Sequence, residues 1–172
     1  MKILGIDPGL RFTGFGIIEI INSKAHYINS GVICTETTDS LSLRIKTIFD
    51  GINQIIQTHN PQAVSIEKVF VNNNPNSTLL LGQARGSAIC ACVSNDLEVH
   101  EYTALQVKQS VVGYGHATKD QISKMVKHYL NLATAPQKDA ADGLAIALTH
   151  SNYSKICDTF KISSIRKGRL IK

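Results

Sequence analysis

The chain has 172 residues, of which 43% are hydrophobic and 18% are charged. This length and composition fit one globular domain and exclude a disordered or fibrous protein. No apolar run reaches the roughly 18 residues of a membrane helix, and Asp7 interrupts the short apolar N-terminal stretch, so no secretory signal is evident. We therefore expect a cytoplasmic protein that has reduced cysteines and no membrane partner.

The positive charge is concentrated at the C-terminal end of the sequence. The formal net charge is +5, and residues 155–172 contain six basic residues and one acidic residue, so the rest of the chain is balanced. A basic tail on a neutral body is typical of proteins that bind nucleic acid, and it is also typical of a solubilising terminus. We expect one domain over residues 1–154 and a flexible basic tail over residues 155–172.

Strand and helix patterns alternate along the sequence. Short apolar runs rich in β-branched residues predict strands over residues 2–7, 13–21, 26–35, 63–70 and 97–102. Helical spacing predicts one helix from Leu41 to a break at Asn60 and Pro61, and a second from a cap at Ser77 to about residue 95. Further helices are expected over residues 103–153, with breaks at 113–115 and 135–136.

This order of elements predicts an α/β domain. The first three strands follow one another with only turns between them, so they are expected to be antiparallel. The later strands alternate with helices, which places helices on the faces of a mixed sheet.

Four carboxylates occur where packing does not explain them. Asp7 ends the first predicted strand and Glu67 lies in the fourth, while Asp139 and Asp142 are one turn apart in a predicted helix. Each has a simpler explanation when taken alone, because Asp7 can form an Asx turn, a strand carboxylate can face solvent, and the first turn of a helix favours acids. If the first and fourth strands are neighbours, however, all four acids can meet at one end of the sheet.

Four clustered carboxylates favour a metal site. Their mutual repulsion requires a cation, and oxygen ligands without His or Cys suit Mg²⁺ or Mn²⁺ rather than zinc. Two such ions about 4 Å apart can bind the attacking and leaving oxygens of a phosphoryl displacement. The pattern therefore indicates metal-dependent phosphoryl chemistry.

Five short motifs occur in order along the chain. They are Gly5-Ile6-Asp7-Pro8-Gly9 followed by Thr13-Gly14-Phe15-Gly16, then Ile66-Glu67-Lys68-Val69-Phe70, Leu81-Gly82-Gln83-Ala84-Arg85-Gly86, Gln106-Val107-Lys108-Gln109 and Asp139-Ala140-Ala141-Asp142. Together they resemble the bacterial RuvC family of Holliday-junction resolvases, from residue 1 to about residue 150. The basic tail lies outside this resemblance.

The resemblance implies an RNase H-like fold with a five-stranded mixed sheet, its first three strands antiparallel, and helices on both faces. It implies a homodimer that binds a four-way DNA junction and cuts two strands of like polarity at symmetrical positions. Water would be the nucleophile, with two Mg²⁺ per subunit in the active complex and Mn²⁺ as a substitute. The ligatable nicks would carry 5′-phosphates and serve recombination and DNA repair, with the RuvA–RuvB branch-migration complex as a partner.

The resemblance also assigns roles to individual residues. Asp7, Glu67, Asp139 and Asp142 match the family's catalytic, metal-binding acids. Lys108 and Lys119 match positions implicated in catalysis or DNA contact, and we expect Lys119 to be catalytic as well as DNA-binding, although both could be ordinary exposed lysines.

Several further positions carry weaker expectations. Phe70 either stacks on a base near the crossover or belongs to the core. Arg85 is expected to contact DNA, and Arg11, Lys68 and Lys138 are weaker candidates for phosphate contacts.

Three glycines need an explanation. Gly82 and Gly86 form a smooth strip on a predicted helix, which suits packing on the sheet, a dimer contact or a close approach of DNA. Gly143 stands where the family usually has Ala, and it costs helix stability without removing a catalytic group.

Three other functions remain open on the sequence. The related YqgF nucleases process RNA, but they are shorter and typically lack the Leu81–Gly86 motif. Kinases and actin-like ATPases share the opening motif, but they need a second domain for which 172 residues leave little room. A junction-binding protein without chemistry would not need all four acids.

Overall fold

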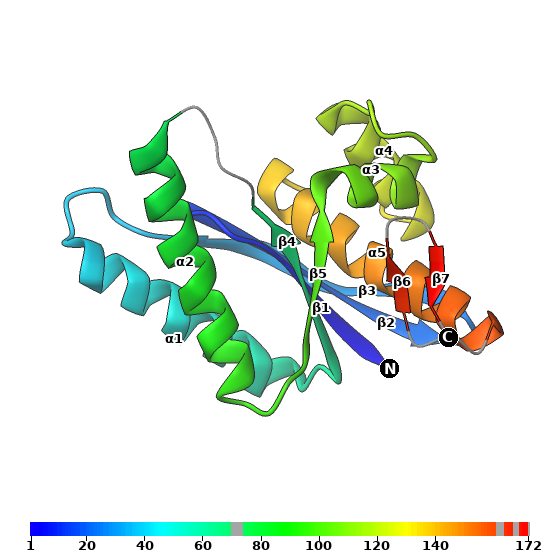
Figure 1. Ribbon diagram of the computed structural model, residues 1–172, viewed down its shortest axis with the longest axis horizontal. Coiled ribbons are helices and arrows are strands. Elements are labelled where there is room, and N and C mark those ends of the chain that lie inside the picture. Colours follow the sequence, from blue (N-terminus) through cyan, green and yellow to red (C-terminus); the bar gives the residue numbers. More distant parts are fainter. Residues whose placement is uncertain (70–73, 161–163, 167–168, 172) are drawn as a thin grey trace.

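The structure is a computed structural model that describes residues 1–69, 74–160, 164–166 and 169–171, with side chains described up to residue 156. It forms one twisted sheet between two layers of helices, with a small hairpin beside the end of the last helix (Figure 1).

The sheet has five strands in the order β3-β2-β1-β4-β5. Strands β1 (Lys2–Asp7), β2 (Phe12–Ile21) and β3 (Lys24–Cys34) form an antiparallel meander. Strands β4 (Ala63–Lys68) and β5 (Val99–Thr103) run parallel to β1, with β4 directly beside it. The predicted mixed sheet with three antiparallel strands is confirmed.

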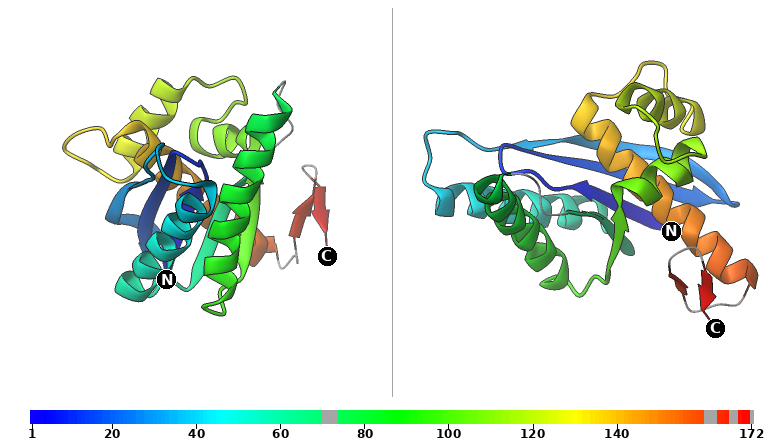
Figure 2. Two further views of the ribbon diagram at one scale, coloured as in Figure 1. Left: turned by 90° about the vertical axis from the view of Figure 1, so that its left-hand side faces the viewer. Right: turned by 45° about the horizontal axis from the view of Figure 1, so that its top comes forward.

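Helices cover both faces of this sheet (Figure 2). Helices α1 (Leu41–His59) and α2 (Pro75–Val93) cover one face. Helix α5 (Lys138–Phe160) crosses the other face, where α3 (Ala104–Val112) and α4 (Lys119–Tyr129) pack against it. Among the described residues, no helix has the length and apolar character needed to cross a bilayer.

Several boundaries differ from those predicted. The cap predicted at Ser77 is wrong, because the Asn74 side chain accepts a hydrogen bond from the Ser77 backbone N–H and Pro75 begins α2. Strand β4 ends at Lys68 rather than at residue 70. Strand β5 begins at Val99 because residues 94–97 complete the turn after α2 through backbone hydrogen bonds to Cys92 and Val93.

The C-terminal region contains more regular structure than its composition indicates. The boundary expected at residue 154 falls inside α5, which continues to Phe160. Two short strands, β6 (Ser164–Arg166) and β7 (Arg169–Ile171), then pair as an antiparallel hairpin.

Candidate metal-dependent active site

The strand order brings two of the predicted acids side by side. Strand β1 pairs with β4 in parallel, with Ile6 opposite Ile66, so Asp7 and Glu67 follow at adjacent strand ends. Side chains alternate between the faces of a strand. Because Gly5 lies under α5 and the Ser65 hydroxyl donates to the Ile146 carbonyl, Asp7 and Glu67, two residues further on, belong to the face covered by α5.

Glycines on the strands let the backbone of α5 lie directly against the backbone of this face. A Cβ on Gly14 would collide with the Asp139 backbone, and a Cβ on Gly16 would lie 2.5 Å from the Leu144 nitrogen. From the helix side, a Cβ on Gly143 would lie 2.5 Å from the carbonyl carbon of Phe15. Gly143, which stands where the family usually has Ala, therefore suits its contact with Phe15, because the start of α5 rests directly on β2.

This approach completes a carboxylate cluster. One oxygen atom from each of Asp7, Asp139 and Asp142 lies within 4.8 Å of the others. The Glu67 carboxyl is close enough to Asp7 and Asp142 to interact with both electrostatically, and it stands outside this three-residue set. The structure thus gathers all four predicted acids at one end of the sheet.

Basic side chains border the cluster. Lys119, the first residue of α4, places its Nζ 2.7 Å from Asp142 Oδ2. Lys108 on α3 is close enough to Glu67 to favour the ionised carboxylate. Both lysines line a cavity of about 280 Å³ together with Asp7, Glu67 and Asp142.

The electrostatics of the acids show that they are crowded. Burial, and then the neighbouring Glu67 and Asp142, raise the pKa of Asp7 to about 8. Burial and Asp142 likewise raise the pKa of Glu67 above its ordinary value. The hydrogen bond to Asp142 raises the pKa of Lys119. A buried set of carboxylates that resists ionisation is stabilised by a divalent cation.

The donor set fits Mg²⁺ or Mn²⁺. All four groups offer carboxylate oxygens, which these hard cations prefer. Asp7, Asp139 and Asp142 would hold an ion, with Glu67 close enough to contribute a further carboxylate. The metal site inferred from the sequence is therefore supported by the chemistry and placement of its ligands.

Arg85 occupies a different environment from the one expected. Its side chain is only 18% exposed, and its Nε donates to the Glu67 carbonyl at 3.1 Å. The same guanidinium pairs with Glu101 on β5, which also lies 3.7 Å from Lys68. The sequence analysis missed Glu101, because an acid in a short strand gives no signal of a partner 16 residues away.

Other predicted or notable residues lie elsewhere. Phe70 falls outside the described residues. His116 is exposed, whereas His150 is buried in the core, where its Nδ1 lies 2.9 Å from the Tyr102 hydroxyl and its ring stacks on His100. Burial lowers the pKa of His150 to about 4, so it is neutral at physiological pH. His150 is therefore a core residue, and it does not line the cavity that holds the acids.

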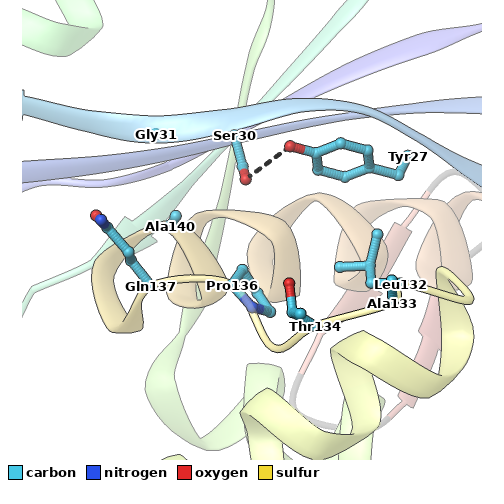
Figure 3. A pocket seen from close by; sticks show the side chains of 9 residues that line it. All are labelled: Tyr27, Ser30, Gly31, Leu132, Ala133, Thr134, Pro136, Gln137 and Ala140. Atoms are coloured by element: carbon cyan, nitrogen blue, oxygen red, sulfur yellow. Dashed lines mark hydrogen bonds between the residues drawn. The ribbon is translucent and has the colours of Figure 1, made fainter.

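A second hollow, of about 470 Å³, lies between β3 and the segment joining α4 to α5 (Figure 3). The Tyr27 hydroxyl and Ser30 Oγ hydrogen-bond along its strand side, while Pro136 and Gln137 face them from the segment before α5. Its lining contains no carboxylate, lysine or histidine. The smaller cavity with the acids is therefore the candidate active site.

Comparisons with known proteins show which family the chain resembles. The family described as "Crossover junction endodeoxyribonuclease RuvC" matches residues 3–150. Proteins of that name from Burkholderia thailandensis and Burkholderia mallei are each 52% identical to the chain, with 99% of both chains covered.

Solved structures show the same fold. Thermus thermophilus RuvC in complex with Holliday junction substrate aligns with a TM-score of 0.85 and 32% identity, covering 91% of this chain and 96% of that one. The yeast mitochondrial resolvase Ydc2, at 13% identity and a TM-score of 0.63, shares the fold. The resemblance noted from the five motifs is confirmed, and the chain belongs to the RuvC family of crossover junction endodeoxyribonucleases.

Proposed function

We propose that the protein is a Mg²⁺-dependent resolvase that cuts Holliday junctions during recombination and DNA repair. The observation that carries the proposal is the convergence of Asp7, Asp139 and Asp142 within 4.8 Å, with Glu67 lining the same cavity as Asp7 and Asp142. Relatives 52% identical over 99% of the chain bear the name of such an enzyme. The related Thermus thermophilus protein is described in complex with a Holliday junction.

In this proposal the four acids bind metal, and the two lysines offset the negative charge of the phosphate. Asp7, Glu67, Asp139 and Asp142 would together hold two Mg²⁺ ions. Bound Mg²⁺ supplies Lewis-acid polarisation of the phosphate and activation of water. Lys119 pairs with Asp142 in the structure. When Asp142 serves the metal, the ammonium group of Lys119 can stabilise the charge that develops on the phosphate, with Lys108 beside it.

The proposed products are nicks with 5′-phosphate and 3′-hydroxyl ends, cut at symmetrical positions. Symmetry requires two sites, because a junction with approximate two-fold symmetry presents two equivalent strands. We therefore propose a homodimer as the active form. Contacts of the basic C-terminal region with DNA or with the RuvA–RuvB complex remain predictions, as does base stacking by Phe70.

The exposed face of α2 supports the dimer. Leu79 and Val93 are 67% and 58% exposed, and Gly82 and Gly86 lie between them at helical spacing. A Cβ on either glycine would meet no described atom within 4 Å. An apolar stripe with small residues at its centre allows two copies of the helix to pack closely around a two-fold axis.

A substitution in this stripe tests the dimer. The native chain is expected to sediment as a dimer, and Gly86→Arg is expected to sediment as a monomer that no longer makes paired cuts. Leu43→Arg, on the exposed part of α1, is the matched control because it places the same charge on an apolar surface outside the stripe. A dimeric Gly86→Arg protein would contradict this interface.

The function itself is tested on an end-labelled four-way junction with Mg²⁺, beside a linear duplex of the same sequence. Paired symmetrical nicks in the junction alone are expected. Binding without cleavage in Mg²⁺ or Mn²⁺ would contradict the proposed metal site. Absence of any junction preference would instead favour the RNA-processing alternative.

A further inference from the structure

An exposed aromatic side chain and a cation form a stacked pair at the turn between β1 and β2. The Arg11 guanidinium carbon lies 5.0 Å from the centroid of the Phe12 ring. Phe12 is 43% exposed and lies outside both hydrophobic core clusters. Within the part of the chain that the structure describes, Arg11 makes no salt bridge with an acid. The pair is thus open to solvent and carries an uncompensated positive charge.

The strand register places Phe12 beside the metal ligands. Gly14 is the cross-strand partner of Asp7, and its Cα faces the Asp139 backbone. Residues two apart on a strand share a face, so Phe12 belongs to the face that carries the acids. Two residues of strand span about 7 Å, which puts Phe12 just beyond the carboxylate cluster, on the β2 side. Lys108 and Lys119 border the cluster from α3 and α4.

The backbone that presents this pair is held firmly. Thr13 Oγ1 donates to the Gly9 carbonyl at 2.7 Å, which closes the turn from the inside. The Leu10 carbonyl accepts from Thr35 Oγ1 at 2.5 Å and from the Arg44 guanidinium at 3.4 Å. A backbone held in this way loses little further freedom when the side chains that it carries bind a ligand.

We propose that Arg11 and Phe12 form a nucleobase-stacking subsite, which takes an unstacked base of the strand next to the phosphate that is cut. The exposed ring offers a face to the base, and the Arg11 charge neutralises the adjoining phosphate, as in other sites for unpaired nucleotides. The subsite rests on the proposed junction substrate, whose crossover contains bases that can leave the stack.

The hollow of Figure 3 is a weaker candidate for the same role. Its Ser30 pairs with Gly16, whereas Phe12 pairs with Cys34, so the hollow lies on the other side of Gly14 along the sheet. It has no cation to meet a phosphate. Because only the Arg11–Phe12 pair offers a positive charge to a phosphate, it is the better site of the two for the DNA strand.

The test measures junction binding by the full-length protein in Ca²⁺, which separates binding from cleavage. Phe12→Ala is expected to weaken binding about tenfold, since each stacked base contributes on the order of that factor. Phe12→Tyr retains a ring and is expected to bind as the native protein does. Arg11→Gln is expected to lower the salt dependence of binding by about one phosphate contact. Ile21→Ala is the matched control, because Ile21 is 46% exposed at the opposite end of β2.

A second readout locates the contact directly. With 5-iodouracil placed beside the cut position, irradiation is expected to crosslink the DNA to Phe12, as mapped by mass spectrometry of the peptides. Equal junction affinities of the native and Phe12→Ala proteins, with no crosslink at Phe12, would overturn the subsite. If the native protein cuts junctions normally in that case, the proposed function stands. If the native protein does not bind the junction at all, both the proposed function and the subsite are contradicted.

Discussion

The two faces of the sheet differ in how closely a helix backbone approaches the strands. Under α5, the strand residues Gly5, Gly14 and Gly16 meet helix backbone directly. Under α1 and α2, large side chains fill the space between the layers. Fully buried members of that layer are Leu4, Ile6, Ile17, Ile48, Ile52 and Ile66.

The strand glycines bring α5 closer to the sheet than large side chains would. Helices that pack through large side chains lie about 8–10 Å from their neighbours, which would hold α5 too far from β1 for its acids to reach Asp7. Both faces also bury large apolar side chains, among them Ile3 and Ile18 on the α5 side, and each contributes stabilisation of about 25 cal/mol per Å² of apolar area. The α5 layer therefore positions the acids in addition to stabilising the sheet, whereas the α1 and α2 layer serves stability.

The largest expected effect comes from the acid at the centre of the cluster. Asp7→Asn is expected to lower cleavage by at least about 10³-fold, because it removes a ligand of the proposed metal site. Junction binding is expected to remain, since Asp7 contacts metal rather than phosphate. Gel-shift and cleavage assays on one preparation check both expectations. Loss of binding as well would show that the acid-bearing face contributes to DNA affinity through Asp7.

The second effect is a dependence of stability on pH in metal-free buffer. Because folding raises the pKa of Asp7 from 3.8 to about 8, the unfolded chain loses its proton first as the pH rises. The free energy of unfolding is therefore expected to fall between pH 4 and pH 8, by on the order of a few kcal/mol. The raised pKa of Glu67 acts in the same direction.

Thermal unfolding with EDTA measures this effect. Asp7→Asn is expected to raise the melting temperature at pH 8 and to flatten its pH dependence, whereas Mg²⁺ is expected to stabilise only the native protein. Lys119 does not interfere, because the stabilisation that its raised pKa reflects is constant below pH 10.5, its ordinary value, and is lost only as the pH rises above it. A native melting temperature that stays constant between pH 4 and pH 8 would show that the acids are not crowded.

The third test changes one residue in the packing layer on each side of the sheet. Gly16→Ala adds a Cβ against the Leu144 backbone, and overpacking of this kind costs about 1–3 kcal/mol. Ile52→Val removes a methyl group from the opposite face and costs about 0.5–1.5 kcal/mol. Only Gly16→Ala is expected to lower cleavage strongly at temperatures where both proteins are folded. Equal activity of the two variants would show that the separation of α5 from β2 does not control the acids.

The four acids could be picked out as candidate site residues from the sequence, because the patterns that mark them are local. Asp7 and Glu67 each follow a recognisable buried strand, and Asp139 and Asp142 share one helical face. Their meeting depended on a condition, that the first and fourth strands are neighbours, and the strand order fulfils it. The close contact of Gly16 with Leu144 was not predictable in the same way, because it joins residues 128 positions apart that no local pattern connects.

The preferences for helix-capping residues also gave a wrong prediction where two residues fitted them equally well. Asn74 and Ser77 are both good helix caps, and only the structure shows that Asn74 is used. The DNA contact expected of Arg85 stays a prediction, and nothing in the sequence indicated the partners that Arg85 has within the protein. Its contacts with the Glu67 carbonyl and with Glu101 depend on the packing of α2 over β4 and β5.

Arg85 gives the smallest expected effect, at the point where the α2 layer reaches the active site. Its guanidinium holds the backbone of Glu67 from the face opposite the acids. Arg85→Gln is expected to lower kcat about tenfold and to raise the Mg²⁺ concentration needed for half-maximal rate, with junction affinity unchanged. Lys46→Ala is the matched control, because it removes a cation from an exposed ion pair on α1. If junction affinity and its salt dependence fall instead, Arg85 contacts DNA, as the sequence predicted, and the α1 and α2 face contributes to binding rather than to the placement of Glu67.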